Sequence, residues 1–126
     1  MNRMELLQRL VLDTISDDFE NVDQVILREV AEQGARYGLT VDRFDIVEAL
    51  RALVEGGLAK AYDLFPGIQD PFSGELPGMP PLEAVEEDFR TYFYITEKGM
   101  DFNLKDATAW PFDDEGEFRT GGKPPL

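Results

Sequence analysis

A proline- and glycine-rich segment, residues 66–88, constrains the fold of this sequence most strongly. It contains five prolines and three glycines. Proline lacks a backbone N–H and interrupts both helix interiors and central strands, so this segment is expected to be a long connection. Only its end, residues 81–87, is compatible with a helical turn, with proline near the start. The sequence on either side must therefore supply the regular structure and the core.

Three patterns of helical periodicity precede this segment, over residues 4–15, 22–37 and 40–55. In each, apolar residues recur at spacings of three and four, which places them on one face of an α-helix. These faces are expected to meet the strands that follow in a single core. The residues predicted to be buried together are Leu10, Ile26, Val30, Phe44, Val47, Leu50, Val54, Phe93 and Ile95.

Residues at the boundaries support the same division into helices. Asn21 precedes the second pattern, and Gln24 follows three residues later, which predicts a capping box. Gly38 is placed to end that helix in the left-handed conformation. Thr40 is predicted to cap the third helix, and the pair Gly56 and Gly57 to end it.

Two strand patterns flank the proline-rich segment, at residues 58–65 and 89–95. The second is dense in threonine, tyrosine, phenylalanine and isoleucine, which favour strands. A two-stranded hairpin is marginal alone, so it is expected to pair antiparallel and to pack on the helices. Thr96 then caps a short helix. The predicted class is mainly α with a small β-hairpin (α+β), in one domain over residues 1–105.

The remaining residues, 106–126, form an irregular acidic tail that contains three aromatic residues, Trp110, Phe112 and Phe118. Disordered acidic segments usually lack such residues. We therefore expect the three aromatic side chains to anchor the tail on its own domain, or on a partner such as a second copy of the chain.

The composition excludes several kinds of chemistry. With no cysteine and no histidine, the chain has no disulfide, no thiolate metal site and no imidazole base. Ser16 and Ser73 are its only serines, and neither has a histidine to activate it. The acidic runs 86–88 and 113–115 are expected to be solvated, and the second departs from the spacing of a calcium loop. We predict no catalytic, cofactor or metal site, and no enzyme activity.

Two segments carry a resemblance to a known superfamily. Residues 48–58, EALRALVEGGL, resemble the end of the recognition helix in winged helix-turn-helix proteins, most closely the MarR- and PadR-like regulators. Residues 94–99, YITEKG, are similar to the point where the second wing strand of those proteins leads into a helix. The resemblance covers residues 4–102. It implies a winged helix, with a three-helix core and a two-stranded antiparallel wing whose long loop is residues 66–88.

The resemblance also implies a DNA-binding face, made of the third helix (residues 40–55) and the wing tip. On the third helix, the candidate DNA contacts are Thr40, Arg43 and Arg51. This sequence departs from the pattern in its charge, because that helix carries two arginines against four acidic residues and the wing carries six acidic residues and no base. The presumed face has a net charge of −8, and DNA affinity depends on cations at phosphates.

The whole chain has a formal net charge of −14, which opposes binding to nucleic acid and to anionic membranes. Our leading hypothesis is a protein-interaction module that does not bind DNA directly. The alternative is a dimeric MarR/PadR-like transcriptional regulator that uses Arg28, Arg36, Arg43 and Arg51 locally, and a third idea is an inhibitor that mimics DNA. The N-terminus lacks the apolar run of a signal peptide, so a soluble cytoplasmic protein is expected.

Overall fold

The computed structural model describes residues 2–105, with the side chains of 2–103. The predicted tail at 106–126, with its proposed anchors Trp110, Phe112 and Phe118, lies outside the described residues. The elements in chain order are α1 (Arg3–Thr14), β1 (Glu20–Asn21), the π-helical turn η1 (Val22–Ile26), α2 (Leu27–Ala35), α3 (Arg43–Glu55), β2 (Ala59–Asp63), the 3₁₀ turns η2 (Pro71–Gly74) and η3 (Leu82–Ala84), β3 (Thr91–Ile95) and α4 (Glu97–Lys105).

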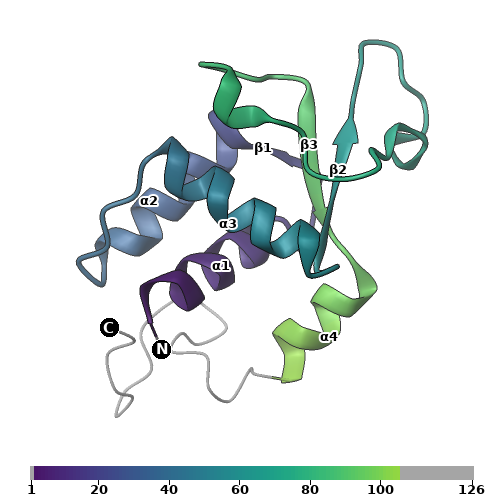
Figure 1. Ribbon diagram of the computed structural model, residues 1–126. Helices are drawn as coiled ribbons and strands as arrows, with labels where there is room; N and C mark the ends of the chain where they lie inside the picture. Colours follow the sequence, from purple (N-terminus) through teal and green to yellow (C-terminus); the bar gives the residue numbers. More distant parts are fainter. Residues whose placement is uncertain (1, 106–126) are drawn as a thin grey trace.

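Helices α1, α2 and α3 pack together beside a small sheet (Figure 1). The core is aliphatic apart from Phe93, which comes from β3 and is fully buried among the helices. None of the helices within residues 2–105 is long and apolar enough to cross a membrane. The helical side chains buried in this core include Leu6, Leu7, Leu10, Val11, Ile26, Val30, Ile46, Val47, Leu50 and Leu53.

The sheet confirms the predicted hairpin and adds a strand to it. β2 pairs antiparallel with β3, from Ala59 opposite Ile95 to Asp63 opposite Thr91. β1 pairs with the other edge of β3, so the strand order is β1-β3-β2. The predicted class, an α+β winged helix, is confirmed. The two-residue strand β1 was missed because so short a strand leaves no alternating pattern in the sequence.

The start of the third helix differs from the prediction. Asp42, not Thr40, is the N-cap, and it forms a reciprocal capping box with Asp45. A carboxylate at this position accepts from the free amides of the first turn as readily as a hydroxyl does. Helix α3 therefore begins at Arg43, three residues after the predicted cap.

Phe44 is 62% exposed, so its predicted burial was wrong. From Phe44 through Val47 to Leu50 the predicted stripe advanced in steps of three residues, and each such step turns about 300° around an α-helix. A stripe built this way drifts around the helix. The buried face follows Ile46, Leu50 and Leu53, and Phe44 points almost directly away from it. Val54, also predicted to be buried, is only partly so.

The second helix begins as predicted but is less regular. The side chain of Asn21 accepts hydrogen bonds from the amides of Asp23 and Gln24, so the cap is correct. The reciprocal half of the capping box is not formed, and the Gln24 side chain accepts from the Tyr92 hydroxyl at 3.4 Å. The helix ends near Gly38, whose φ of 73° confirms the predicted left-handed position.

The proline-rich loop does not project as a free wing tip. Leu76 donates its amide to the carbonyl of Ala61 at 2.9 Å, so the loop returns along the outer edge of β2. It then crosses to α3 through η3, whose Leu82 is only 3% exposed and joins the core (Figure 1). The helical turn predicted near residues 81–87 is confirmed as η3.

Candidate interaction face

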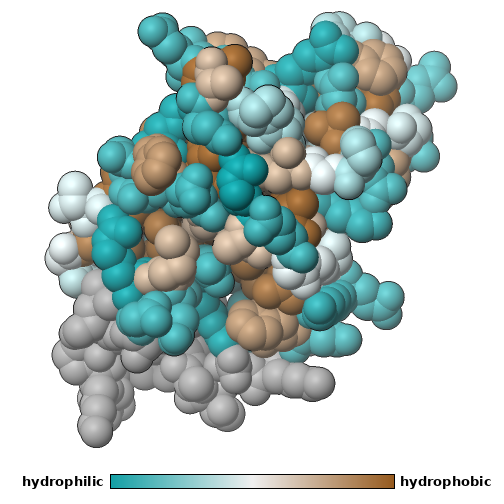
Figure 2. Space-filling model, in the orientation of Figure 1, coloured by the Kyte–Doolittle hydropathy of each residue, from teal (hydrophilic) through white to brown (hydrophobic). Residues whose placement is uncertain are grey.

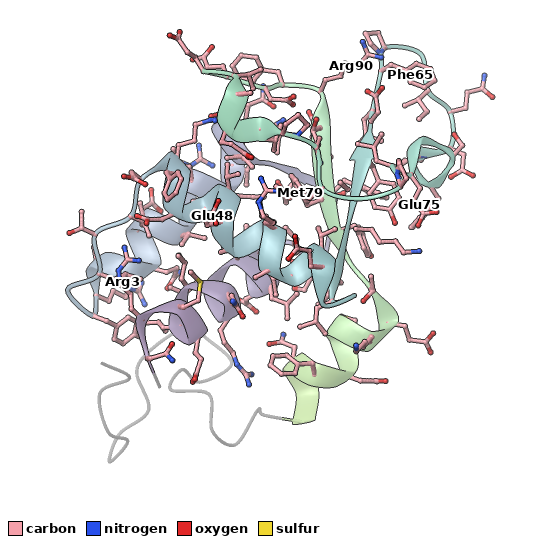
Figure 3. The ribbon with its side chains drawn as sticks, viewed as in Figure 1. Arg3, Glu48, Phe65, Glu75, Met79 and Arg90 are labelled. Carbon is pink, nitrogen blue, oxygen red and sulfur yellow. The ribbon has the colours of Figure 1, made fainter. Side chains whose placement is uncertain are left out.

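The outer face of α3 is the surface that the winged-helix resemblance assigns to DNA. Phe44, Ala52 and Glu55 are exposed on it, and Glu48 is partly exposed. In Figure 3, the Glu48 side chain extends from the middle of α3, and Met79 from the returning loop lies beside the helix. An exposed phenylalanine thus lies among carboxylates where a DNA-binding helix presents cations.

Arg43 lies on the flank of α3 and is bonded within the protein. Its Nε and Nη2 donate to the two carboxylate oxygens of Asp23 at 2.7 and 3.3 Å. Its Nη1 donates to the Leu82 carbonyl of η3 at 2.8 Å. The Arg43 and Asp23 side chains are 20% and 9% exposed. This paired geometry fixes the guanidinium firmly, because all three of its nitrogens are bonded.

Asp23 links three parts of the chain. Besides Arg43, its carboxylate accepts the backbone amide of Asp88 at 2.8 Å. Asp88 in turn accepts from the amide and the hydroxyl of Thr91, at 2.6 and 3.0 Å, where β3 begins. One aspartate at the start of the second helix therefore joins α3, the end of the loop and β3. Asp23 was not singled out from the sequence, since nothing local distinguishes it from the other acidic residues.

Arg51 is two turns further along the same flank of α3. Its guanidinium pairs with the carboxylate of Glu83 in the loop, and its Nε lies 3.8 Å from Glu48. Both arginines predicted as DNA contacts are therefore on one side of α3, as their spacing required, and each is paired with a carboxylate of the protein.

The other predicted cations and the predicted cap are not part of this face. Arg28 lies on α2 and Arg36 follows it directly. The Thr40 carbonyl accepts a hydrogen bond from Arg3 Nη2 at 2.9 Å, and the same guanidinium reaches Asp45 at 3.2 Å. The assignment of Thr40, Arg43 and Arg51 to DNA stays a prediction.

Asp45 shows how the start of α3 is stabilised. Desolvation raises the pKa of this carboxyl group, but the amide of Asp42 and the Arg3 guanidinium outweigh it and hold the pKa below its ordinary value of 3.8. The first turn of α3 therefore carries negative charge at neutral pH, close to the exposed Phe44.

Four aromatic rings cover the face of the sheet that points away from the helices. Phe19 is central, with ring centroids 4.9 Å from Tyr62, 5.1 Å from Phe72 and 4.7 Å from Tyr94. Their edge-to-face and tilted contacts are the arrangements that aromatic pairs favour. Phe19 directly precedes β1 and Phe72 lies in η2, and neither was singled out from the sequence.

Within residues 2–105, no group of three or more acidic side chains is placed to hold a metal ion. The acidic run at 113–115 and the anchors Trp110, Phe112 and Phe118 lie outside the described residues, so their roles stay predictions.

A scan against protein-family models gives no match, and neither does a search of curated proteins. Among solved structures, the chain is similar to a PadR family transcription regulator from hypervirulent Clostridium difficile, with a TM-score of 0.52 and 16% identity. The match covers 82% of this chain and 85% of the regulator. At this identity the likeness concerns the backbone arrangement alone, and that arrangement is the winged helix.

Proposed function

We propose that this chain is a non-enzymatic winged-helix protein that acts as a protein-interaction module, and that its α3 face binds protein rather than DNA. One observation carries the proposal: Arg43 and Arg51, the two arginines of α3, are both paired with the chain's own carboxylates. The side chains between and beside them are the exposed Phe44 and Ala52 and the partly exposed Glu48. An exposed aromatic residue surrounded by charge is typical of a protein contact.

Electrostatics support this choice. A DNA complex gains free energy by releasing counterions from phosphates that cations neutralise. Arg43 would have to leave Asp23, and Arg51 would have to leave Glu83, before either could do so. The approach of DNA would also bring phosphates close to the loop acids Glu83, Glu86 and Glu87, which are exposed.

A second candidate is a regulator that binds DNA through α3. The likeness to the PadR regulator favours this alternative more than it favours an interaction module. In this alternative Arg51 is the more available contact, because its side chain is 27% exposed and its partner Glu83 is 43% exposed. Such surface pairs exchange partners at little cost.

One experiment decides between the two candidates. Fluorescence anisotropy of the full chain with labelled double-stranded DNA, both mixed-sequence and from regions upstream of genes, is measured at low and at physiological salt. We expect no sub-micromolar binding at physiological salt. Arg51→Ala tests the direct contact, and Lys98→Ala, which removes an exposed cation from α4 at the opposite end of the hairpin from the wing tip, is the control.

Sub-micromolar binding that weakens steeply with salt, and that Arg51→Ala abolishes while Lys98→Ala does not, would overturn the protein-interaction proposal and favour the regulator. Phe44→Ala adds a positive test of the first candidate. A partner protein recovered by the parent chain should be lost from this variant, because Phe44 is exposed and its truncation leaves the core intact.

A further inference from the structure

Exposed apolar side chains concentrate on α3 and in the loop that returns to it. Within residues 2–103, eight large hydrophobic side chains are exposed, and five of them belong to α3 or to residues 65–89. Phe44 on α3 is 62% exposed, and Val85 in the returning loop is 44% exposed. Exposed apolar side chains that gather on one part of a surface, within a polar rim, mark a contact with another molecule.

The crossing segment, residues 82–88, lies beside Phe44. The Arg43 guanidinium holds this segment at both ends: it donates to the carbonyl of the first residue at 2.8 Å, and it pairs with Asp23, which accepts the amide of the last residue. Phe44 directly follows Arg43 in the helix, and Val85 lies in the middle of the crossing segment. The two exposed apolar side chains therefore border one surface.

Carboxylates surround this pair of apolar side chains. The exposed or partly exposed acids of α3 and the crossing segment are Glu48, Glu55, Glu83, Glu86 and Glu87. The sequence has no lysine or arginine from residue 61 to residue 89, and both arginines of α3 are already paired. Figure 2, in which α3 faces the viewer, shows separate apolar patches set among hydrophilic side chains. A partner for this surface must supply cations as well as apolar side chains.

We propose that the partner of the α3 face is a basic amphipathic helix of another protein, with its apolar side against Phe44 and Val85 and with lysine or arginine beside the surrounding carboxylates. This inference rests on the proposed function and adds the chemistry of the partner. Ala52 is exposed about two turns along α3 from Phe44, and its small side chain lets a second helix approach closely. The 13 residues of α3 rise about 20 Å, which is enough to pair with three to four turns of a partner helix.

A second copy of this chain does not fit the surface. In a twofold dimer the same patch meets itself, so the carboxylates of one copy would face those of the other. Like charges in contact disfavour a complex, and the same charge disfavours anionic membranes. A basic segment is instead attracted before it makes contact, and its cations then replace the solvent around carboxylates that the protein leaves exposed.

A dye on α3 locates the binding. The chain has no cysteine, so Ala52→Cys provides a single site for an environment-sensitive dye, and Ala35→Cys at the exposed end of α2 is the matched control. Each labelled full chain is titrated at physiological salt with two synthetic helices that share one apolar face, one with lysine and arginine on its polar face and the other with glutamate. We expect the basic helix to change the emission of the dye on α3 and not of the dye on α2. The acidic helix should bind at least about tenfold more weakly.

Two pairs of variants test the contacts, each measured by the anisotropy of the labelled basic helix. Phe44→Ala should weaken binding by about tenfold or more, whereas Phe72→Ala, which truncates an aromatic side chain exposed on the outer face of the sheet, should not. Glu86→Lys should also weaken binding, whereas Glu32→Lys, which makes the same change of charge on α2, should not. All four side chains are exposed, so each variant is expected to fold.

Three results of these titrations would overturn the inference: no binding of the basic helix, equal binding of the acidic helix, or binding that Phe44→Ala or Glu86→Lys leaves unchanged. A dye on α3 that responds to protein concentration without any peptide would assign the surface to a second copy and would overturn it too. The proposed function fails by a different result, sub-micromolar DNA binding through Arg51, so the two failures are distinguishable.

Discussion

Asp23 accepts three hydrogen bonds, two from Arg43 and one from the amide of Asp88, and it is 9% exposed. Arg43→Ala removes two of them and leaves both the carboxylate and the Leu82 carbonyl short of donors. Hydrogen bonds to charged groups contribute roughly 1.5–3 kcal/mol. We expect a loss of that order in the free energy of unfolding, measured by urea denaturation at pH 7.

Arg51→Ala serves as the control for this prediction. It also removes an arginine from α3, but its pair with Glu83 is exposed and should contribute less than about 1 kcal/mol. Equal losses for the two variants would show that the Asp23 network does not hold α3, η1 and the loop together.

The carboxyl group of Asp13 predicts how the stability of the folded state changes with pH. Although the residue is exposed to solvent overall, partial desolvation of its carboxyl group raises the pKa above the ordinary value of 3.8, and the neighbouring negative charges of Asp17 and Glu29 raise it further. Since the folded state binds this proton more tightly than the unfolded state, the unfavourable contribution of the ionised group is present at neutral pH. It is relieved as the pH falls through the raised pKa.

Asp13→Asn should therefore raise the urea midpoint at pH 7. The substitution also removes a negative charge from the last turn of α1. A negative charge there interacts unfavourably with the helix dipole, by about 0.3–1 kcal/mol, so its removal adds to the gain in stability. The gain over the parent should shrink as the pH is lowered toward 4. A gain that is constant with pH would mean that the ionised carboxylate is not its source.

The junction between α4 and β2 depends on one close approach of two backbone segments. At Gly99, in the first turn of α4, an added Cβ would lie 2.2 Å from the Leu58 carbonyl oxygen. Gly99→Ala must displace α4 from β2 and should cost about 1–3 kcal/mol. Gly78→Ala is the control, because its added methyl meets nothing within 4 Å. Thermal unfolding of the two variants measures the difference, and similar melting temperatures would contradict this account of the junction.

Among the helices and strands, those with a repeating apolar pattern were predicted from the sequence, and the short strand β1, which has no such pattern, was missed. Three helical periods and two alternating strands were enough to predict the order of the elements and the hairpin. β1 has only two residues, and its pairing depends on where α1 ends, since the amide of Ile95 donates to the Ile15 carbonyl at 3.2 Å. Such tertiary pairing leaves no local pattern.

The candidate site was predicted in part for a similar reason. Arg43 and Arg51 lie eight residues apart, just over two helical turns, and this spacing places them on one side of α3. Their carboxylate partners, Asp23 and Glu83, are 20 and 32 residues away in the sequence. Only the folded loop brings these acids to the helix, so the pairing was not visible from local sequence.

At the scale of the whole molecule, the excess of acidic over basic residues affects the stability of the folded state. The chain has 26 acidic and 12 basic residues, and several of the cations are already used in exposed pairs such as Arg3–Asp45 and Arg90–Asp63. Each exposed pair contributes at most about 1 kcal/mol. The excess negative charge repels itself throughout the compact state, and unfolding relieves that repulsion by spreading the charges apart.

Added salt should therefore stabilise this protein at neutral pH. Raising NaCl from about 0.02 to about 0.2 M shortens the screening length from roughly 20 Å to below 10 Å, which weakens repulsion between distant carboxylates more than attraction within contacting pairs. The expected result is a higher urea midpoint at pH 7, urea being chosen because it is uncharged. Near pH 5, closer to the pI of about 4.2, the net charge is smaller and the gain should shrink. A midpoint that falls with salt at pH 7 would mean that the ion pairs outweigh the repulsion, and that α3 and its loop are held by stronger electrostatic contacts than their exposure indicates.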